Sequence, residues 1–260
     1  MSVLRGIITL AILPSVAVAQ SPPGTRLSVT VRVTTVTMRL DTSDITYVVK
    51  NEASSAESLA QFAVDAPAPV YQVFDPAPGH WFISKKVGSR SAAVWAALDV
   101  QTPPGQDTPS LRFVAVGLPA IVTSWTQGYY SVPDAADAAA DTMPESDVLT
   151  TSVLDTTVGV EPFPVDRTAA GLIVRLRGLL TQACGTSLPW ITSSSVCNSL
   201  DAELDTASQR LSVADTAGTR AKIQEFNSTL TAQHGTGLPV NDSAYWLLKA
   251  NADYVLNRRL

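Results

Sequence analysis

Short runs in which apolar and polar side chains alternate fill the chain between residues 26 and 128. In the first run the apolar residues occupy odd positions from Leu27 to Val33, the two-residue period of a half-buried strand. After Thr34 and Thr35 they move to even positions, as a β-bulge or a tight turn would require. Further runs lie at 45–49, 60–64, 70–74, 81–83, 92–97, 111–116 and 121–126. About eight strands separated by Pro, Gly, Ser and Asp predict an all-β sandwich, with a closed barrel as the alternative.

From residue 167 the period of the pattern changes to that of an amphipathic helix. The apolar stripe of the first helix runs from Leu172 to Ala183, and Gly185 is a typical stop after it. Candidate N-cap residues precede the next three helices: Ser193, Ser194 or Ser195, then Asp215 or Thr216, then Asp242. The corresponding stripes are Val196, Leu200, Leu204, Ala207 and Leu211; Ile223, Phe226 and Leu230; and Ala244, Leu248, Ala252 and Val255. Short loops between the helices predict an antiparallel four-helix bundle.

The fold class that follows is α+β in separate domains, with a β-sandwich over 20–130 and the bundle over 167–260. The connection over 131–166 is acidic, since eight Asp or Glu between residues 132 and 167 face only Arg167. Such a segment buries little apolar surface, so we expect a loosely held linker. Its Val and Thr content over Leu149–Val160 allows one edge strand of the sandwich.

The first nineteen residues have the layout of a signal peptide. Arg5 supplies one positive charge, an apolar run follows it, and Ala17-Val18-Ala19 gives the small residues of a cleavage site before Gln20. The apolar run is shorter than the ~20 residues that span a bilayer, and no later segment can span one. We therefore expect a cleaved, exported protein that is secreted, periplasmic or on the cell surface.

Cys184 and Cys197 are the only cysteines, and they flank the corner between the first two predicted helices. In an oxidising exterior such a pair forms a disulfide, which for a loop of this length is worth ~3 kcal/mol. The alternatives are a catalytic thiol and half of a metal site.

Two parts of the chain resemble known families. The segments Pro189-Trp190-Ile191, Val196–Ala207 and Asp242–Tyr254 resemble the FIMAH-type domain, a helical module near the C-termini of exported bacterial proteins. The likeness covers roughly 165–260, with Asn227 standing where similar sequences have an apolar residue. More weakly, the β half is similar to immunoglobulin-like modules. Its matching segments are Tyr47–Asn51, Gly79–Trp81, Ala93–Trp95 and Pro103–Gly105. The resemblance implies an accessory surface module and brings no catalytic residues.

The residues that would support a reaction are scarce. His80 and His234 are the only histidines, and they fall in different domains, so neither a Ser-His-Asp set nor a zinc site is indicated. Asp134, Asp137 and Asp141 could converge on calcium, but a solvated linker explains them better. We expect no cofactor. Neither half has the clustered Lys and Arg of a nucleic-acid surface, because residues 20–164 carry fifteen acids against eight bases.

Aromatic residues give the best indication of a ligand. Trp81, Tyr129 and Tyr130 lie near turns of the β half, where exposed rings stack on sugars or anchor protein interfaces. The sequence therefore predicts a non-catalytic, exported protein of binding, adhesion or accessory function, with a glycan or protein ligand. The alternative is an extracellular hydrolase whose carboxylate pair the sequence does not single out.

Overall fold

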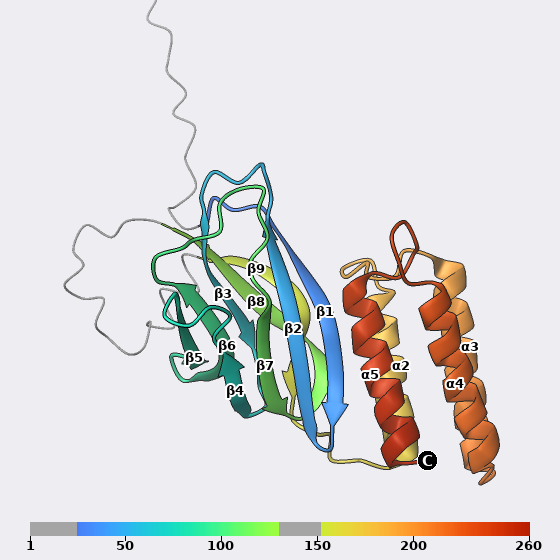
Figure 1. Cartoon of the computed structure of the whole chain (residues 1–260). Coiled ribbons are helices and arrows are strands. Elements are labelled where there is room, and N and C mark those ends of the chain that lie inside the picture. The colour runs from blue at the N-terminus through green and yellow to red at the C-terminus, as the bar shows by residue number, and fades with distance from the viewer. Residues whose placement is uncertain (1–24, 130–151) are drawn as a thin grey trace, which may run out of the picture.

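The computed structural model describes residues 25–129 and 152–260, in which two antiparallel sheets precede four helices (Figure 1). The predicted signal peptide and residues 131–151 of the predicted linker lie outside the described residues. The strands are β1 (Val29–Arg39), β2 (Thr42–Asn51), β3 (Leu59–Asp65), β4 (Val70–Phe74), β5 (Trp81–Val87), β6 (Arg90–Ala97), β7 (Leu111–Val116), β8 (Leu118–Gly128) and β9 (Val153–Glu161). The helices are α2 (Ala169–Ala183), α3 (Ser194–Ser212), α4 (Thr216–Ala232) and α5 (Asp242–Arg258).

The change of phase near Thr34 is a β-bulge within β1. Val33 faces Tyr47 and Thr35 faces Thr46, so Thr34 is the extra residue of the pair of strands. The hydroxyl of Thr34 donates to the carbonyl of Thr46 at 3.2 Å. The strand therefore continues as far as Arg39 and turns back only at Leu40 and Asp41.

The strand order is that of an immunoglobulin-like sandwich, so the alternative of a closed barrel is wrong. One sheet has the order β1-β2-β7-β4 and the other β5-β6-β3-β8-β9. Across the first sheet, β1, β2, β7 and β4 correspond to strands A, B, E and D of a constant-type immunoglobulin domain. In the second sheet, β3, β8 and β9 correspond to C, F and G. The hairpin of β5 and β6 is an addition that extends the second sheet beside β3. Strand β9 lies at the opposite edge, within the region where the sequence allowed an edge strand.

Aromatic side chains form the centre of the sandwich. Tyr47 stacks on Phe113 with ring centroids 6.1 Å apart, and Phe62 stacks on Trp95 at 5.9 Å. The Tyr47 hydroxyl donates to the carbonyl of Val158 on the opposite sheet. Because the ring is fully enclosed, burial raises the pKa of the Tyr47 phenol well above its ordinary value. This cluster joins the two sheets where antibody domains carry a Trp packed on a disulfide.

Two of the three predicted N-caps are confirmed, Ser193 and Asp215, and the third is corrected. Thr168, Ser193, Asp215 and Asn241 each accept a hydrogen bond from a backbone N–H in the first turn. Asp242 was predicted to cap α5, but the structure makes it the first helical residue. Asn241 is the cap because its own backbone is extended. The unexpected polar residue Asn227 donates to Asp253 of α5 at 2.8 Å, which explains a polar side chain at that position.

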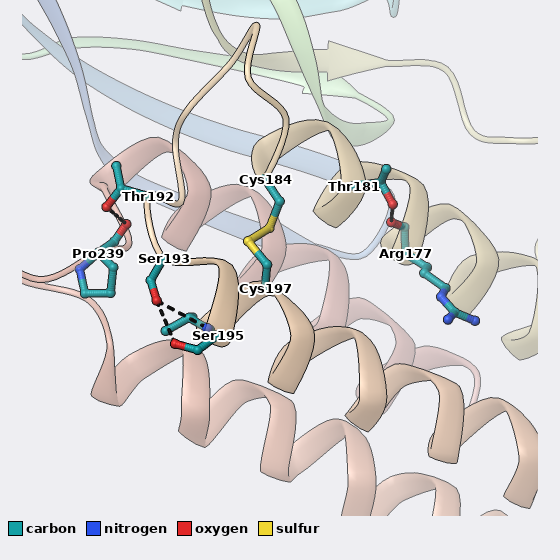
Figure 2. Close-up of a disulfide and its surroundings, with 9 residues drawn as sticks. Arg177, Thr181, Cys184, Thr192, Ser193, Ser195, Cys197 and Pro239 are labelled. Atoms are coloured by element: carbon teal, nitrogen blue, oxygen red, sulfur yellow. Dashed lines mark hydrogen bonds between the residues drawn. A yellow bond between two sulfur atoms is a disulfide. The ribbon is translucent and has the colours of Figure 1, made fainter.

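A disulfide joins Cys184 to Cys197, as predicted, and excludes a free catalytic thiol at either position (Figure 2). Cys184 is the C-cap of α2 and Cys197 lies in the first turn of α3. The bond therefore fixes the end of one helix to the start of the next, across the loop that carries Trp190.

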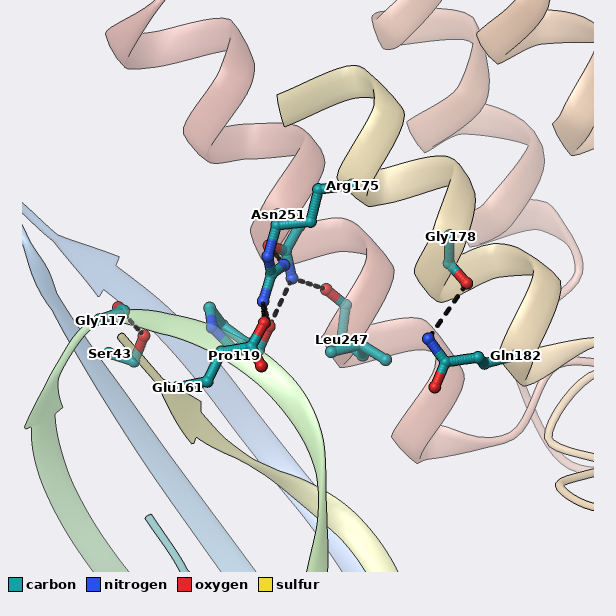
Figure 3. A network of polar contacts seen from close by, with 9 residues as sticks. All are labelled: Ser43, Gly117, Pro119, Glu161, Arg175, Gly178, Gln182, Leu247 and Asn251. Atoms are coloured by element: carbon teal, nitrogen blue, oxygen red, sulfur yellow. Dashed lines mark hydrogen bonds and ion pairs between the residues drawn. The ribbon is translucent and has the colours of Figure 1, made fainter. Parts of the chain in front are cut away.

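The bundle contacts the sandwich through α5, which lies alongside β1, and through a polar cluster at the ends of β8 and β9 (Figures 1 and 3). Arg175 of α2 donates to Asn251 at 2.8 Å and to the carbonyl of Pro119 at 3.1 Å. It also forms an ion pair with Glu161. Asn251, in turn, donates to the same Pro119 carbonyl at 3.1 Å. Because Arg175 is only 12 % exposed, these bonds fix the two domains in one relative orientation.

Candidate ligand pocket at the loop end of the sandwich

A pocket of about 530 Å³ opens at the end of the sandwich that lies away from the bundle. Two connections form it, the one from β4 to β5 and the one from β6 to β7. The residues that line it are Ala77, His80, Trp81, Val100, Gln101, Thr102, Pro103, Gln106, Asp107 and Pro109. The connection from β2 to β3 leaves this end too, which in antibody variable domains carries the antigen-binding loops.

The connection from β4 to β5 is shaped by Asp75. Its carboxylate accepts from the backbone N–H of Ala77 at 3.0 Å and of Gly79 at 3.3 Å, the pattern of an Asx turn. Gly79 has a φ of +87°, which a residue with a side chain rarely adopts. The turn places His80 and Trp81 side by side at the start of β5.

The longer connection from β6 to β7 is held by Asn51, a fully buried residue at the end of β2. The Asn51 side-chain amide donates to the carbonyls of Glu57 and Thr102, at 3.0 and 2.9 Å. Its backbone N–H donates to Gln106, and its carbonyl accepts from Gly105. One asparagine thus fixes two loops, so the pocket has a preformed shape. In the sequence Asn51 marks only the end of a strand, because most of the groups that it binds are distant along the chain.

The pocket combines an apolar wall with a polar rim. Its apolar lining residues are Ala77, Trp81, Val100, Pro103 and Pro109. At the rim, Nδ1 of His80 lies 3.0 Å from both carboxylate oxygens of Asp99. Both of those side chains are about half exposed. On another side of the rim, Asp107 forms an ion pair of 3.0 Å with Arg32. Such a site can pack a flat apolar face while imidazole, carboxylate and amide groups hydrogen-bond to its edge.

The three aromatic residues predicted to contact a ligand have different positions. Trp81 lines the pocket but is only 7 % exposed, because it pairs with Ala97 and its ring packs into the core. Little of the Trp81 ring is therefore open to a stacking ligand, and its role in binding stays a prediction. Tyr129 is 52 % exposed at the same end of the sandwich, outside the pocket lining. Tyr130 lies outside the described residues.

Both histidines are paired with carboxylates. In the bundle, Nε2 of His234 lies 2.7 Å from Asp242, and its ring stacks on Tyr245 with centroids 3.9 Å apart. Within residues 25–129 and 152–260, no serine, threonine or cysteine side chain hydrogen-bonds to either histidine. Asp134, Asp137 and Asp141, the candidate calcium ligands, lie outside those ranges.

The described residues contain neither a cluster of metal ligands nor a helix that could span a membrane. No group of three or more His, Cys, Asp or Glu is close enough to hold a metal ion in that part of the chain. None of its helices has both the length and the apolar character needed to cross a bilayer.

Comparison with known proteins found likenesses among solved structures only. No family model matches the chain, so the FIMAH-type character of residues 165–260 remains a prediction. No curated protein matches it either. The chain is similar to an uncharacterized protein from Nocardia farcinica, whose crystal structure was described as an immunoglobulin-like fold. The two are 18 % identical, and the match covers 49 % of this chain and 96 % of the other, with a TM-score of 0.29.

Proposed function

We propose that this protein is an exported, non-catalytic binding protein that holds a glycan in the pocket at the loop end of its sandwich. The observation that carries the proposal is the pocket itself, whose lining combines the apolar residues Val100, Pro103 and Pro109 with the polar residues His80, Gln106 and Asp107. Sugars present flat C–H faces and a ring of hydroxyl groups, and this combination of apolar, imidazole, carboxylate and amide groups is complementary to both.

Fixed loops support binding more than turnover. Asn51 and Asp75 hold the two loops through bonds of 2.9–3.3 Å, so little conformational entropy is lost when a ligand enters. The disulfide supports export, because such bonds persist in oxidising compartments.

A glycan array probed with the mature chain tests the proposal. We expect a restricted set of glycans to bind, and His80→Ala to weaken that binding by about tenfold, because a rim hydrogen bond is lost. His234→Ala is the matched control, since it removes a histidine paired with an aspartate in the bundle.

The test for turnover uses the same ligands. After overnight incubation, mass spectrometry should recover each bound glycan unchanged. A cleaved glycan whose release is lost on substitution of one Asp or Glu would establish the hydrolase instead. If no glycan binds, and a protein array instead gives a binder whose affinity falls on His80→Ala, the ligand of the pocket is a protein and the glycan proposal is wrong.

A further inference from the structure

Helix α5 lies beside β1 where the bundle meets the sandwich (Figure 1). A second hollow is lined by residues of both elements. It has a volume of about 440 Å³ and adjoins a smaller hollow of about 230 Å³. Three residues, Leu40, Tyr254 and Arg258, line both. From Trp246 to Arg258 the helix wall is about 18 Å long, at ~1.5 Å per residue.

The strand side of this groove is an unpaired sheet edge. β1 is the end strand of its sheet and pairs with β2 alone. Val36, Thr37 and Met38 are consecutive and all line the groove, so the strand presents its edge as well as its side chains. Across the described chain no helix residue hydrogen-bonds to the backbone of β1. Such an edge offers main-chain donors and acceptors to a further extended segment.

One end of the groove carries uncompensated positive charge. Arg258 and Arg259 are exposed, and neither side chain pairs with another described residue. Asp41 is the one carboxylate lining that end, where it accepts from the Tyr254 hydroxyl at 3.5 Å. Lys249, further along, is neutralised by Asp253 at 2.8 Å. Unpaired guanidinium groups such as those of Arg258 and Arg259 bind carboxylates, often through two parallel hydrogen bonds.

Leu40 adds an apolar contact at the mouth. Its φ is +56°, a left-handed conformation that costs a side-chain-bearing residue free energy, and the side chain is 70 % exposed. The turn thus holds a large apolar group in water beside the two arginines. Trp246 and Met38 provide further apolar surface along the groove.

We propose that this groove binds an extended, acidic peptide segment of another protein. The segment lies along β1, with apolar side chains against Met38, Leu40 and Trp246 and carboxylates against Arg258 and Arg259. At ~3.3 Å per residue, the length of the groove fits five or six residues. Arg175 of α2 bonds both to Asn251 of α5 and to Pro119 of β8, which holds α5 against the sandwich, so the groove exists before the peptide arrives.

Fluorescence anisotropy on the full chain tests the proposal. The probes are two fluorescein-labelled pools of hexapeptides, each with four positions drawn from Val, Leu, Phe and Thr. One pool ends in Asp-Glu and the other in Lys-Lys. We expect only the acidic pool to bind, and Arg258→Gln with Arg259→Gln to weaken it more than about tenfold. Leu40→Gly, which suits the positive φ, should also weaken binding while the protein stays folded.

Arg39→Gln is the matched control, because Arg39 is an exposed arginine of β1 that does not line the groove. It should leave the affinity for the acidic pool unchanged. Three results would overturn the proposal: no binding of the acidic pool, equal binding of the two pools, or acidic binding that the double Arg variant does not weaken. Binding of sodium decanoate without the acidic pool would assign the groove to an amphiphile instead.

Discussion

At the scale of single residues, a few buried polar groups decide the local geometry. Asn51 carries no sequence signal of its importance, because its partners lie 6 and 51 residues away. Trp81 was predicted to be exposed because turn residues precede it, yet the pairing of β5 with β6 turns the ring into the core. Local pattern therefore identified which residues stand near the pocket, while their burial depended on contacts that the sequence does not display.

Replacing Asn51 tests its role as the residue that fixes the connection from β6 to β7. Asn51→Ala removes the side-chain donor of the Glu57 carbonyl and one of the two donors of the Thr102 carbonyl, which keeps the Leu59 N–H, so we expect a loss of ~1–3 kcal/mol in the free energy of unfolding. Urea denaturation measures it. Asn198→Ala, at an exposed position of α3, is the control and should change stability by less than ~0.5 kcal/mol. Equal effects of the two substitutions would contradict the role given to Asn51.

Glu203 gives a prediction about pH. Burial raises the pKa of the Glu203 carboxyl above its ordinary value, although Thr229 donates to one of its oxygens at 2.7 Å. The folded protein therefore binds this proton more tightly than the unfolded chain does, and ionisation costs stability as the pH rises. Glu203→Gln should be more stable than the wild type at pH 7, and the difference should vanish below about pH 4. Thermal melts of both proteins over a range of pH measure it. A difference in stability that stays constant at all pH values would refute it.

At the scale of elements, the apolar stripes predicted all four helices and the alternation predicted the strands, because both periods are local properties of the chain. Whether β1 would bulge or turn at Thr34 could not be decided from the sequence, since either would shift the phase by one residue. The choice of Asn241 over Asp242 as the cap likewise depends on backbone angles that neither side chain reveals.

The disulfide is the element-scale feature whose removal is easiest to measure. Replacing Cys184 and Cys197 by Ala releases a loop whose ends are 13 residues apart, so we expect a loss of ~3 kcal/mol. Chemical denaturation with and without reductant compares the two proteins. Reductant should lower the stability of the wild type to that of the variant and leave the variant unchanged. Two free thiols in the exported protein, found by non-reducing mass spectrometry, would contradict the bond.

At the scale of the whole molecule, the sequence predicted two domains but not their contact. Arg175, Asn251 and Pro119 are far apart in the chain, and none belongs to an apolar stripe. Most buried apolar residues of the sandwich and the bundle nevertheless form one continuous cluster. The orientation of the domains, and with it the groove beside β1, therefore became visible only in the folded chain.

Arg175→Ala tests that contact. The substitution leaves the Glu161 carboxylate and the Asn251 amide oxygen without their donor, so we expect unfolding of the two domains to separate into two transitions. Calorimetry would detect them. Arg177→Ala, two residues away on α2, removes largely exposed ion pairs with Asp201 and Asp205 and should cost less than ~1 kcal/mol. One cooperative transition in both variants would show that Arg175 does not hold the domains together.

The measurement closest to the central claim is NMR mapping of a glycan selected from the array, on the mature chain. Binding at the loop end predicts amide shifts grouped in residues 77–81 and 100–109, with the glycan unchanged at the end of the titration. Shifts confined to the bundle, or a glycan cleaved during the titration, would contradict the account.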